Sequence, residues 1–149
     1  MKNHYPQAVE ECLDPDRTYK VSVLLAVKTF KRSKPWRGTV AERQQKFRTL
    51  NADLAGAYDL PIPRLVFETD ENEDSGSSCF VPSSDTIILR GRLSVVSFLH
   101  EFAHFRFFGR SEREACRWSL NLFRRTFPRS WARLRFEGHV VRTSERRGV

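Results

Sequence analysis

The chain has 149 residues, a length that supports one domain with a single hydrophobic core. Hydrophobic residues make up 40% and charged residues 30%, a composition that excludes a disordered chain and a membrane protein. The longest apolar stretch, residues 21–27, is too short to cross a bilayer, and no apolar signal segment opens the chain. We therefore expect a cytoplasmic protein with one domain over residues 1–149, a core over about 17–136 and a flexible tail over 142–149.

The net charge of +8 is concentrated at one end of the sequence. Residues 1–105 carry 14 basic and 14 acidic residues, whereas residues 106–149 carry 12 arginines and 4 acidic residues. This asymmetry favours an acidic partner such as nucleic acid. A solvated face on C-terminal helices is an equally good interpretation.

Three cysteines are spread along the chain, at positions 12, 79 and 116. Their odd number and the lack of a Cys-x-x-Cys pair argue against a disulfide framework and against a cysteine-based zinc site. We expect them to be reduced thiols.

The first half of the chain is predicted to be mainly helical. A short helix is expected over residues 5–13, and residues 17–32 place apolar side chains on one helical face, although a strand is an alternative there. A longer amphipathic helix is predicted over 40–57. Thr39 and Glu42 have the spacing of a capping box at its start.

Strands follow in the middle of the chain. Residues 64–68 are predicted to form a strand, and residues 69–78 an acidic, serine-rich loop. Two short strands at 79–81 and 86–89, joined by a turn at 82–85, are typical of an antiparallel hairpin.

Helices dominate the C-terminal part. One is predicted over 94–108 with Gly109 as its C-terminal cap, a second over 111–127 and a short third over 129–136, followed by a closing strand or loop at 138–141. The order of elements predicts an α+β fold. We expect a small antiparallel or mixed sheet of about three strands, packed against the first of these helices and several others.

The most informative motif is His-Glu-x-x-His at residues 100–104. Two histidines four positions apart on a helix project from one face, so His100 and His104 can bind the same metal ion. Imidazole nitrogens suit zinc. Glu101 lies one position round the helix, where a general base acting on a metal-bound water is needed. Two core histidines beside an exposed glutamate are the structural alternative.

A catalytic zinc site needs a third protein ligand and one open position. The turn at Gly109 returns the chain along the first helix, so the opening turn of the next helix lies opposite His104. Glu112 and Glu114 are the candidates there. We prefer Glu112, because Glu114 has the capping-box position relative to Ser111. A first-turn carboxylate favoured by the helix dipole is the alternative interpretation of Glu112.

Residues 112–116, read with the motif at 100–104, resemble the second conserved helix of gluzincin metallopeptidases. The layout over about residues 64–125 is similar to compact ImmA/IrrE-like members of that group, in which a strand and a hairpin precede the motif helix. The resemblance implies a zinc metalloendopeptidase that acts on a protein or peptide, with zinc on His100, His104 and Glu112 and with Glu101 activating water. Cys116 stands where the family usually has Asp or Asn beside a ligand histidine, and a thiol is a poor acceptor for that purpose.

Substrate binding and oxyanion stabilisation need further groups. The strand at 86–89 or the strand at 79–81 offers an edge to an extended peptide. His139 is the first candidate for an oxyanion donor and Tyr58 the second, although a surface or capping role for His139 is the more ordinary one. An acidic loop at 70–74 is a candidate to fold over the basic C-terminal part.

A second function class also remains open. The chain is alternatively a basic, DNA-associated or regulatory module that binds through its C-terminal arginines and in which the metal site is structural or absent. No transmembrane segment is expected in either case.

Overall fold

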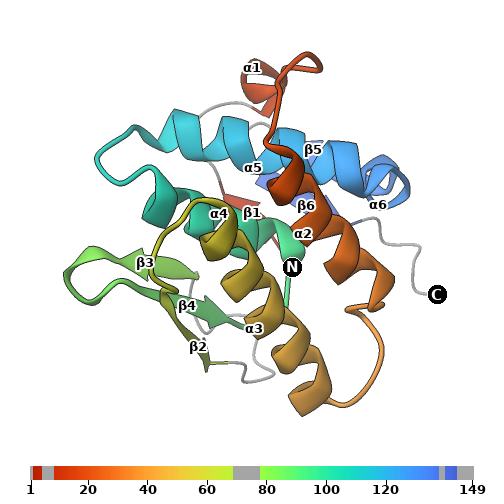
Figure 1. The fold of residues 1–149 in the computed structure, drawn as a ribbon. Helices are drawn as coiled ribbons and strands as arrows, with labels where there is room; N and C mark the ends of the chain where they lie inside the picture. The colour runs from red at the N-terminus through yellow and green to blue at the C-terminus, as the bar shows by residue number, and fades with distance from the viewer. Residues whose placement is uncertain (1, 5–8, 69–77, 138–139, 144–149) are drawn as a thin grey trace.

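The computed structural model describes residues 2–4, 9–68, 78–137 and 140–143 (Figure 1). Over these residues, six α-helices and two three-stranded sheets form an α+β fold, which confirms the predicted fold class. The predicted mixed sheet lies against the helix that carries the two histidines. In this part of the chain, each helix is too short or too polar to span a bilayer.

The two N-terminal helices, α2 (Val21–Arg32) and α3 (Val40–Ala57), pack along one another (Figure 1). The apolar face of α2 is buried, which explains why a helix forms there rather than a strand. Its buried residues are Val23, Ala26, Val27 and Phe30. The predicted capping box of α3 is confirmed, since Thr39 Oγ1 accepts from the Glu42 N–H (3.1 Å) and Glu42 Oε1 accepts from the Thr39 N–H (2.8 Å).

The mixed sheet has the strand order β2-β4-β3. β2 (Arg64–Glu68) runs parallel to β4 (Thr86–Arg90), and β3 (Cys79–Val81) runs antiparallel to β4, as the predicted hairpin requires. A single 3₁₀ turn, η1 (Pro82–Ser84), joins β3 to β4. Because β4 has a neighbour on each side, the expectation that residues 86–89 offer an edge is wrong. Of the two strands considered, only β3 lies at an edge of the described sheet.

Helices α4 (Val95–Arg106) and α5 (Glu112–Thr126) lie side by side (Figure 1). α4 begins at Ser94, whose hydroxyl accepts from the Ser97 N–H (3.2 Å). It ends slightly earlier than predicted, and Gly109 lies in the connecting turn with φ of +89°, a conformation that favours glycine. The tight turn places the first turn of α5 against the last turns of α4.

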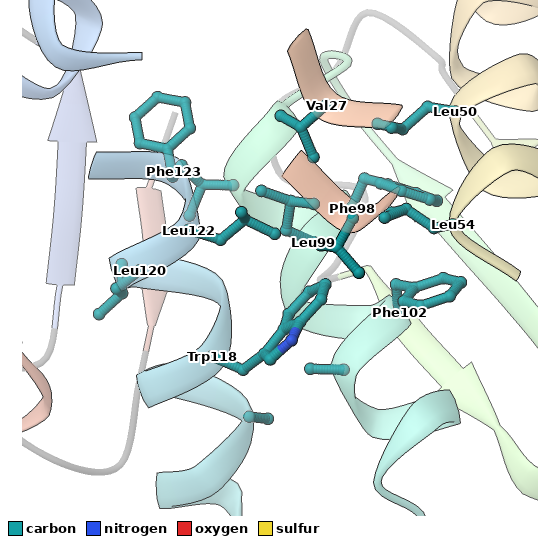
Figure 2. Packing of buried hydrophobic residues seen from close by; sticks show 14 of the residues in the cluster. Val27, Leu50, Leu54, Phe98, Leu99, Phe102, Trp118, Leu120, Leu122 and Phe123 are labelled. Atoms are coloured by element: carbon teal, nitrogen blue, oxygen red, sulfur yellow. The ribbon is translucent and has the colours of Figure 1, made fainter. Parts of the chain in front are cut away.

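The core lies between α4, α5, α2 and α3, and Figure 2 shows its packing. α4, the helix that carries the His-Glu-x-x-His motif, contributes Phe98, Leu99 and Phe102 to the centre of the core. The following core residues are at most 1% exposed: Val27, Leu50, Leu54, Phe98, Leu99, Phe102, Trp118 and Leu122. The Phe102 ring stacks on Trp118 (centroids 6.0 Å apart), which ties α4 to α5. The motif is therefore built on a firmly packed helix pair.

The chain ends form a second sheet. After the short helix α6 (Pro128–Ala132), β5 (Leu134–Glu137) pairs with β6 (Val140–Thr143), and β6 pairs with β1 (Lys2–His4), all antiparallel. The helix predicted to reach residue 136 therefore stops at Ala132. The predicted flexible tail begins too early, because its first two residues belong to β6. The pairing of β6 with β5 on one side and with β1 on the other explains both differences.

The one-turn helix α1 (Val9–Cys12) lies within the helix predicted near the N-terminus and packs against α5. Asn121 of α5, a buried side chain, holds it. Its Oδ1 accepts from the Asp14 N–H (2.7 Å), and its Nδ2 donates to the carbonyls of Cys12 (2.9 Å) and Arg117 (2.7 Å). An N-terminal segment is thereby fixed to the second of the two helices that carry the candidate site.

Candidate metal centre

His100 and His104 project from the same face of α4, one turn apart. Their Nε2 atoms are 3.1 Å from each other and their ring centroids are 4.7 Å apart. His100 is buried, whereas His104 is partly exposed. The two side chains thus present neighbouring nitrogens at the boundary between the core and the solvent.

Glu112 brings a carboxylate from α5 onto both imidazoles. Its Oε2 is 2.6 Å from His100 Nε2, and its Oε1 is 2.8 Å from His104 Nε2. It is the first residue of α5, directly after the tight turn. Three donor atoms from two helices therefore converge on one point.

Glu114, the other candidate for a third ligand, faces elsewhere. Ser111 Oγ accepts from the Glu114 N–H (3.2 Å), which is half of the expected capping box. The Glu114 carboxylate instead accepts from Arg17 Nη2 at 2.8 Å. The geometry thus favours Glu112 over Glu114.

The electrostatics of this cluster follow from its contacts. Burial raises the pKa of Glu112, but the hydrogen bonds with His100 and His104 outweigh burial and hold that pKa well below its ordinary range. The hydrogen bond with Glu112 in turn raises the pKa of His104 above its ordinary value, against the effect of burial. The carboxylate is thus held in its ionised form.

Glu101 lies beside this cluster and is buried. Burial raises its pKa to about 7, although the nearby charge of His104 lowers it. The carboxylate accepts a hydrogen bond from the backbone N–H of Phe80, on the edge strand β3. A carboxyl group with a pKa near neutrality can both take up and release a proton at physiological pH.

The donor set fits zinc. Zinc bonds to imidazole nitrogen and carboxylate oxygen at about 2.0–2.2 Å, so tetrahedral ligands lie about 3.3 Å apart. The two Glu112 oxygens lie 2.6 and 2.8 Å from the two Nε2 atoms, which are 3.1 Å from each other, so a small outward movement of the side chains would make room for the ion. Three protein ligands would leave one position for water or substrate, which is typical of catalytic rather than structural zinc.

Cys116 contacts the rear of the first ligand. His100, Glu112 and Cys116 offer donor atoms within 4.8 Å of one another, but Cys116 Sγ is 3.9 Å from His100 Nδ1, the nitrogen that faces away from Glu112. Cys116 therefore contacts His100 at the ring nitrogen opposite to the one that faces His104 and Glu112. The sequence indicated that a thiol orients a histidine poorly; the structure nevertheless places this thiol where ligand histidines commonly donate their second N–H.

Tyr58, the second candidate for an oxyanion donor, contacts the core aromatic residues. Tyr58 stacks its ring on Phe102 and accepts a hydrogen bond from Trp118 Nε1 (3.0 Å), so the structure brings its hydroxyl to the core aromatics and not to the three donors. His139 and the acidic loop at 70–74 lie outside the described residues.

The arginines of α5 are engaged with the N-terminal segment. Arg113 Nη1 is 3.9 Å from Glu11, and Arg117 Nη2 is 3.6 Å from Asp14. Arg124 lies over the ring of Trp131 (5.6 Å). Basic residues that the sequence concentrates in the C-terminal part are thus partly balanced by acidic residues from the other end of the chain.

Comparison of the chain with protein-family models, with curated proteins and with solved structures found no match.

Proposed function

We propose that the protein is a zinc-dependent metalloendopeptidase similar to the gluzincins. The observation that carries this proposal is the position of Glu112, whose two carboxylate oxygens contact Nε2 of both motif histidines. A histidine pair alone is common in helices. A histidine pair with a carboxylate from a second helix is the ligand set of a hydrolytic zinc centre.

The roles of the residues follow from their contacts. Zinc held by His100, His104 and Glu112 would supply a Lewis acid that polarises a scissile carbonyl and makes water more acidic. Glu101 accepts the proton of the attacking water and returns it to the departing amine, for which a buried carboxyl with a pKa of about 7 is suited.

The edge strand β3 provides the surface for an extended peptide. β3 pairs with β4 on one side only, and its residue Phe80 directs a backbone N–H to Glu101. A substrate strand added to this edge runs directly past the general base. We therefore propose a protein or peptide substrate bound in extended conformation.

The competing interpretation, a nucleic-acid module, gains no support from α5, because Arg113 and Arg117 face acidic residues of the N-terminal segment. A cytoplasmic location is part of the proposal, in keeping with the three free cysteines.

The test is digestion of a defined peptide mixture by the zinc-loaded protein, with cleavage read by mass spectrometry. The variant Glu101→Gln keeps the three ligands and should lower the cleavage rate by about 100- to 10,000-fold while its zinc content stays unchanged. Glu114→Gln makes the same chemical change outside the donor cluster and should leave cleavage intact. A zinc-loaded Glu101→Gln protein as active as the unaltered chain would contradict the proposal, and so would zinc-loaded protein that cleaves nothing.

A further inference from the structure

The connection between α2 and α3, the orange loop in Figure 1, lies in a strongly basic part of the chain. Residues 28–48 contain a single acidic residue, Glu42, whose carboxylate already accepts the Thr39 N–H in the capping box of α3. The basic residues of this segment are Lys28, Lys31, Arg32, Lys34, Arg37, Arg43, Lys46 and Arg48. They form a group separate from the arginines of α5 that face the N-terminal segment.

The turn inside this connection has a well-supported backbone. Lys34 has φ of +57°, and the Arg37 N–H donates to the Lys34 carbonyl (2.9 Å), which closes a turn over residues 34–37. Lys46 Nζ of α3 donates to the carbonyls of Lys34 and Arg37 (3.0 Å each). Gly38 follows with φ of +103°, where a Cβ would lie only 2.6 Å from Glu42 Oε1. The side chains of the turn are therefore presented from a fixed position.

Trp36 lies in the middle of this turn, and its side chain is 58% exposed. The other two tryptophans of the chain are more protected, since Trp118 is 1% exposed and Trp131 is half-buried. Among the residues that the structure describes, no aromatic ring and no cation packs on the Trp36 indole. Its face is therefore open to a flat group of a partner.

The basic side chains nearest to Trp36 in the sequence also face solvent. The exposed ones are Lys28, Arg32, Lys34 and Arg37. Within the described part of the chain, none of these four forms an ion pair with a carboxylate. Lys28 and Arg32 are four positions apart on α2, so they lie on the same face of that helix. The surface thus combines an open aromatic ring with uncompensated positive charge.

α6 begins next to the end of α2 and adds a further arginine to this side of the molecule. Lys31 Nζ donates to the Thr126 carbonyl (2.9 Å) and lies 5.5 Å from the centre of the Phe127 ring, directly before α6. Arg129 of α6 is exposed. The positive surface at the end of α2 is therefore not limited to one segment of the sequence.

We propose that the α2–α3 turn binds single-stranded nucleic acid, with a base stacked on Trp36 and backbone phosphates beside Arg32, Lys34 and Arg37. An exposed aromatic ring among cations is the combination that binds single strands without sequence preference. A single strand offers free base faces to the indole, whereas the bases of a duplex are stacked on one another. This inference goes beyond the proposed peptidase function and does not depend on the metal centre.

A membrane surface fits this turn less well. Helices that lie in the membrane interface bury an apolar face there, whereas α2 and α3 already bury their apolar faces in the core. At the connection, Trp36 and Val40 are the large exposed hydrophobic residues. Val21 and Leu25, the exposed hydrophobic residues of α2, lie in its first turns, at the other end of the helix.

The first experiment measures binding of a fluorescein-labelled oligothymidylate of about 12 nucleotides by fluorescence anisotropy. Trp36→Ala should lower the affinity by about 5- to 100-fold, because the stacked base is lost, and Trp36→Phe should retain most of it. Phe108→Ala is the matched control, since Phe108 is an aromatic residue outside the turn and is 68% exposed. Circular dichroism confirms that each variant is folded. Unchanged affinity in Trp36→Ala would overturn the proposal.

The second experiment measures how the affinity falls with salt. The double variant Arg32→Gln with Arg37→Gln should flatten the slope of log affinity against log salt by about 1.4, since each phosphate contact on a single strand contributes about 0.7. Arg64→Gln with Arg110→Gln removes the same charge at exposed positions outside the turn and should leave the slope nearly unchanged. An equal effect of both double variants would show diffuse attraction and overturn the assigned surface.

The third experiment compares partners. A duplex of the same length, and vesicles of phosphatidylcholine and phosphatidylserine, should bind more weakly than the single strand at about 50 mM salt. Tighter binding of either one, or no binding of the single strand, would overturn the proposal. The result should be the same for zinc-free and zinc-loaded protein. Because no readout involves zinc or peptide cleavage, failure here leaves the proposed function standing, and failure of the proposed function leaves this test valid.

Discussion

Glu112 hydrogen-bonds to both imidazoles, and this has a direct consequence for the proposed metal binding. A metal ion binds to deprotonated ligand nitrogens, so zinc at this site would displace the protons used in these hydrogen bonds. We therefore expect metal binding to be coupled to proton release.

The pH dependence of stability follows from the same groups. His104 has a raised pKa, so the stability from its bond to Glu112 is fully present below its ordinary pKa of 6.5 and is lost as pH rises through the raised value. The pKa of Glu101 is raised from 4.5 to about 7, so its contribution to stability is likewise lost as pH rises between these two values. Glu112, with a lowered pKa, contributes stability above pH 4.5 that is lost as pH falls below it.

We therefore predict that the Tm of the metal-free protein falls between about pH 6 and pH 8, while the rise in Tm on adding zinc grows over the same interval. Differential scanning calorimetry with and without zinc measures both. His104→Ala should show no zinc-dependent rise at either pH. A zinc effect that is equal at both pH values would argue against proton displacement at this cluster.

At the scale of residues, local sequence patterns identified some of the site residues but not the contacts around them. The spacing of His100 and His104 and the short turn before Glu112 indicated three of the convergent donors. The hydrogen bonds of Asn121 with Asp14 and Cys12 could not be predicted, because nothing local connects α5 with the N-terminal segment. The Phe80 N–H that reaches Glu101 is a backbone group, and backbone groups leave no mark on residue identity.

At the scale of elements, the docking of α1 depends on one buried amide. Asn121 accepts a hydrogen bond from the Asp14 N–H and donates one to the Cys12 carbonyl, next to α1, which is a single helical turn. α5 therefore serves both as a ligand-bearing helix and as the anchor of the N-terminal segment.

Replacing Asn121 with alanine should lower the free energy of unfolding by about 1–3 kcal/mol, because the backbone groups of α1 are left unpaired in a buried position. Denaturant unfolding followed by circular dichroism measures the change. The control variant Glu10→Ala, at an exposed position of α1, should change the free energy of unfolding by less than about 0.5 kcal/mol. A loss below that value for Asn121→Ala would show that α1 is held by other contacts.

Elements with local signals were predicted correctly, whereas of the terminal sheet only a closing strand, as an alternative to a loop, was expected near β6. The capping box at Thr39 and the hairpin of β3 and β4 both depend on residues close in sequence. β1, by contrast, has three residues and pairs with β6 at the far end of the chain, so no local pattern marks it. The pairing of β6 with β5 and β1 converts part of the predicted C-terminal helix and tail into strands.

At the scale of the whole molecule, charge along the sequence does not equal charge in space. In the sequence, the C-terminal arginines form a basic segment with few acidic residues. In the folded chain, Arg113 lies beside Glu11, and Arg117 lies beside Asp14. A sequence count cannot anticipate this, because it depends on the docking of α1 against α5.

The candidate metal centre is supported by the core as a whole. α4 and α5 meet through Phe102 and Trp118, and Phe98 extends the same packing toward Phe47 of α3. Tight packing holds the two helices that carry His100, His104 and Glu112 in place, as a preorganised metal site requires.

The most direct test of this account is the zinc content of the purified protein, measured by elemental analysis beside three variants. We predict about one zinc per chain for the unaltered protein and for Glu114→Gln, and none for His104→Ala or Glu112→Gln. Absence of zinc from the unaltered protein, even after incubation with the metal, would contradict the central claim. Retention of zinc by Glu112→Gln together with its loss from Glu114→Gln would contradict the assigned third ligand.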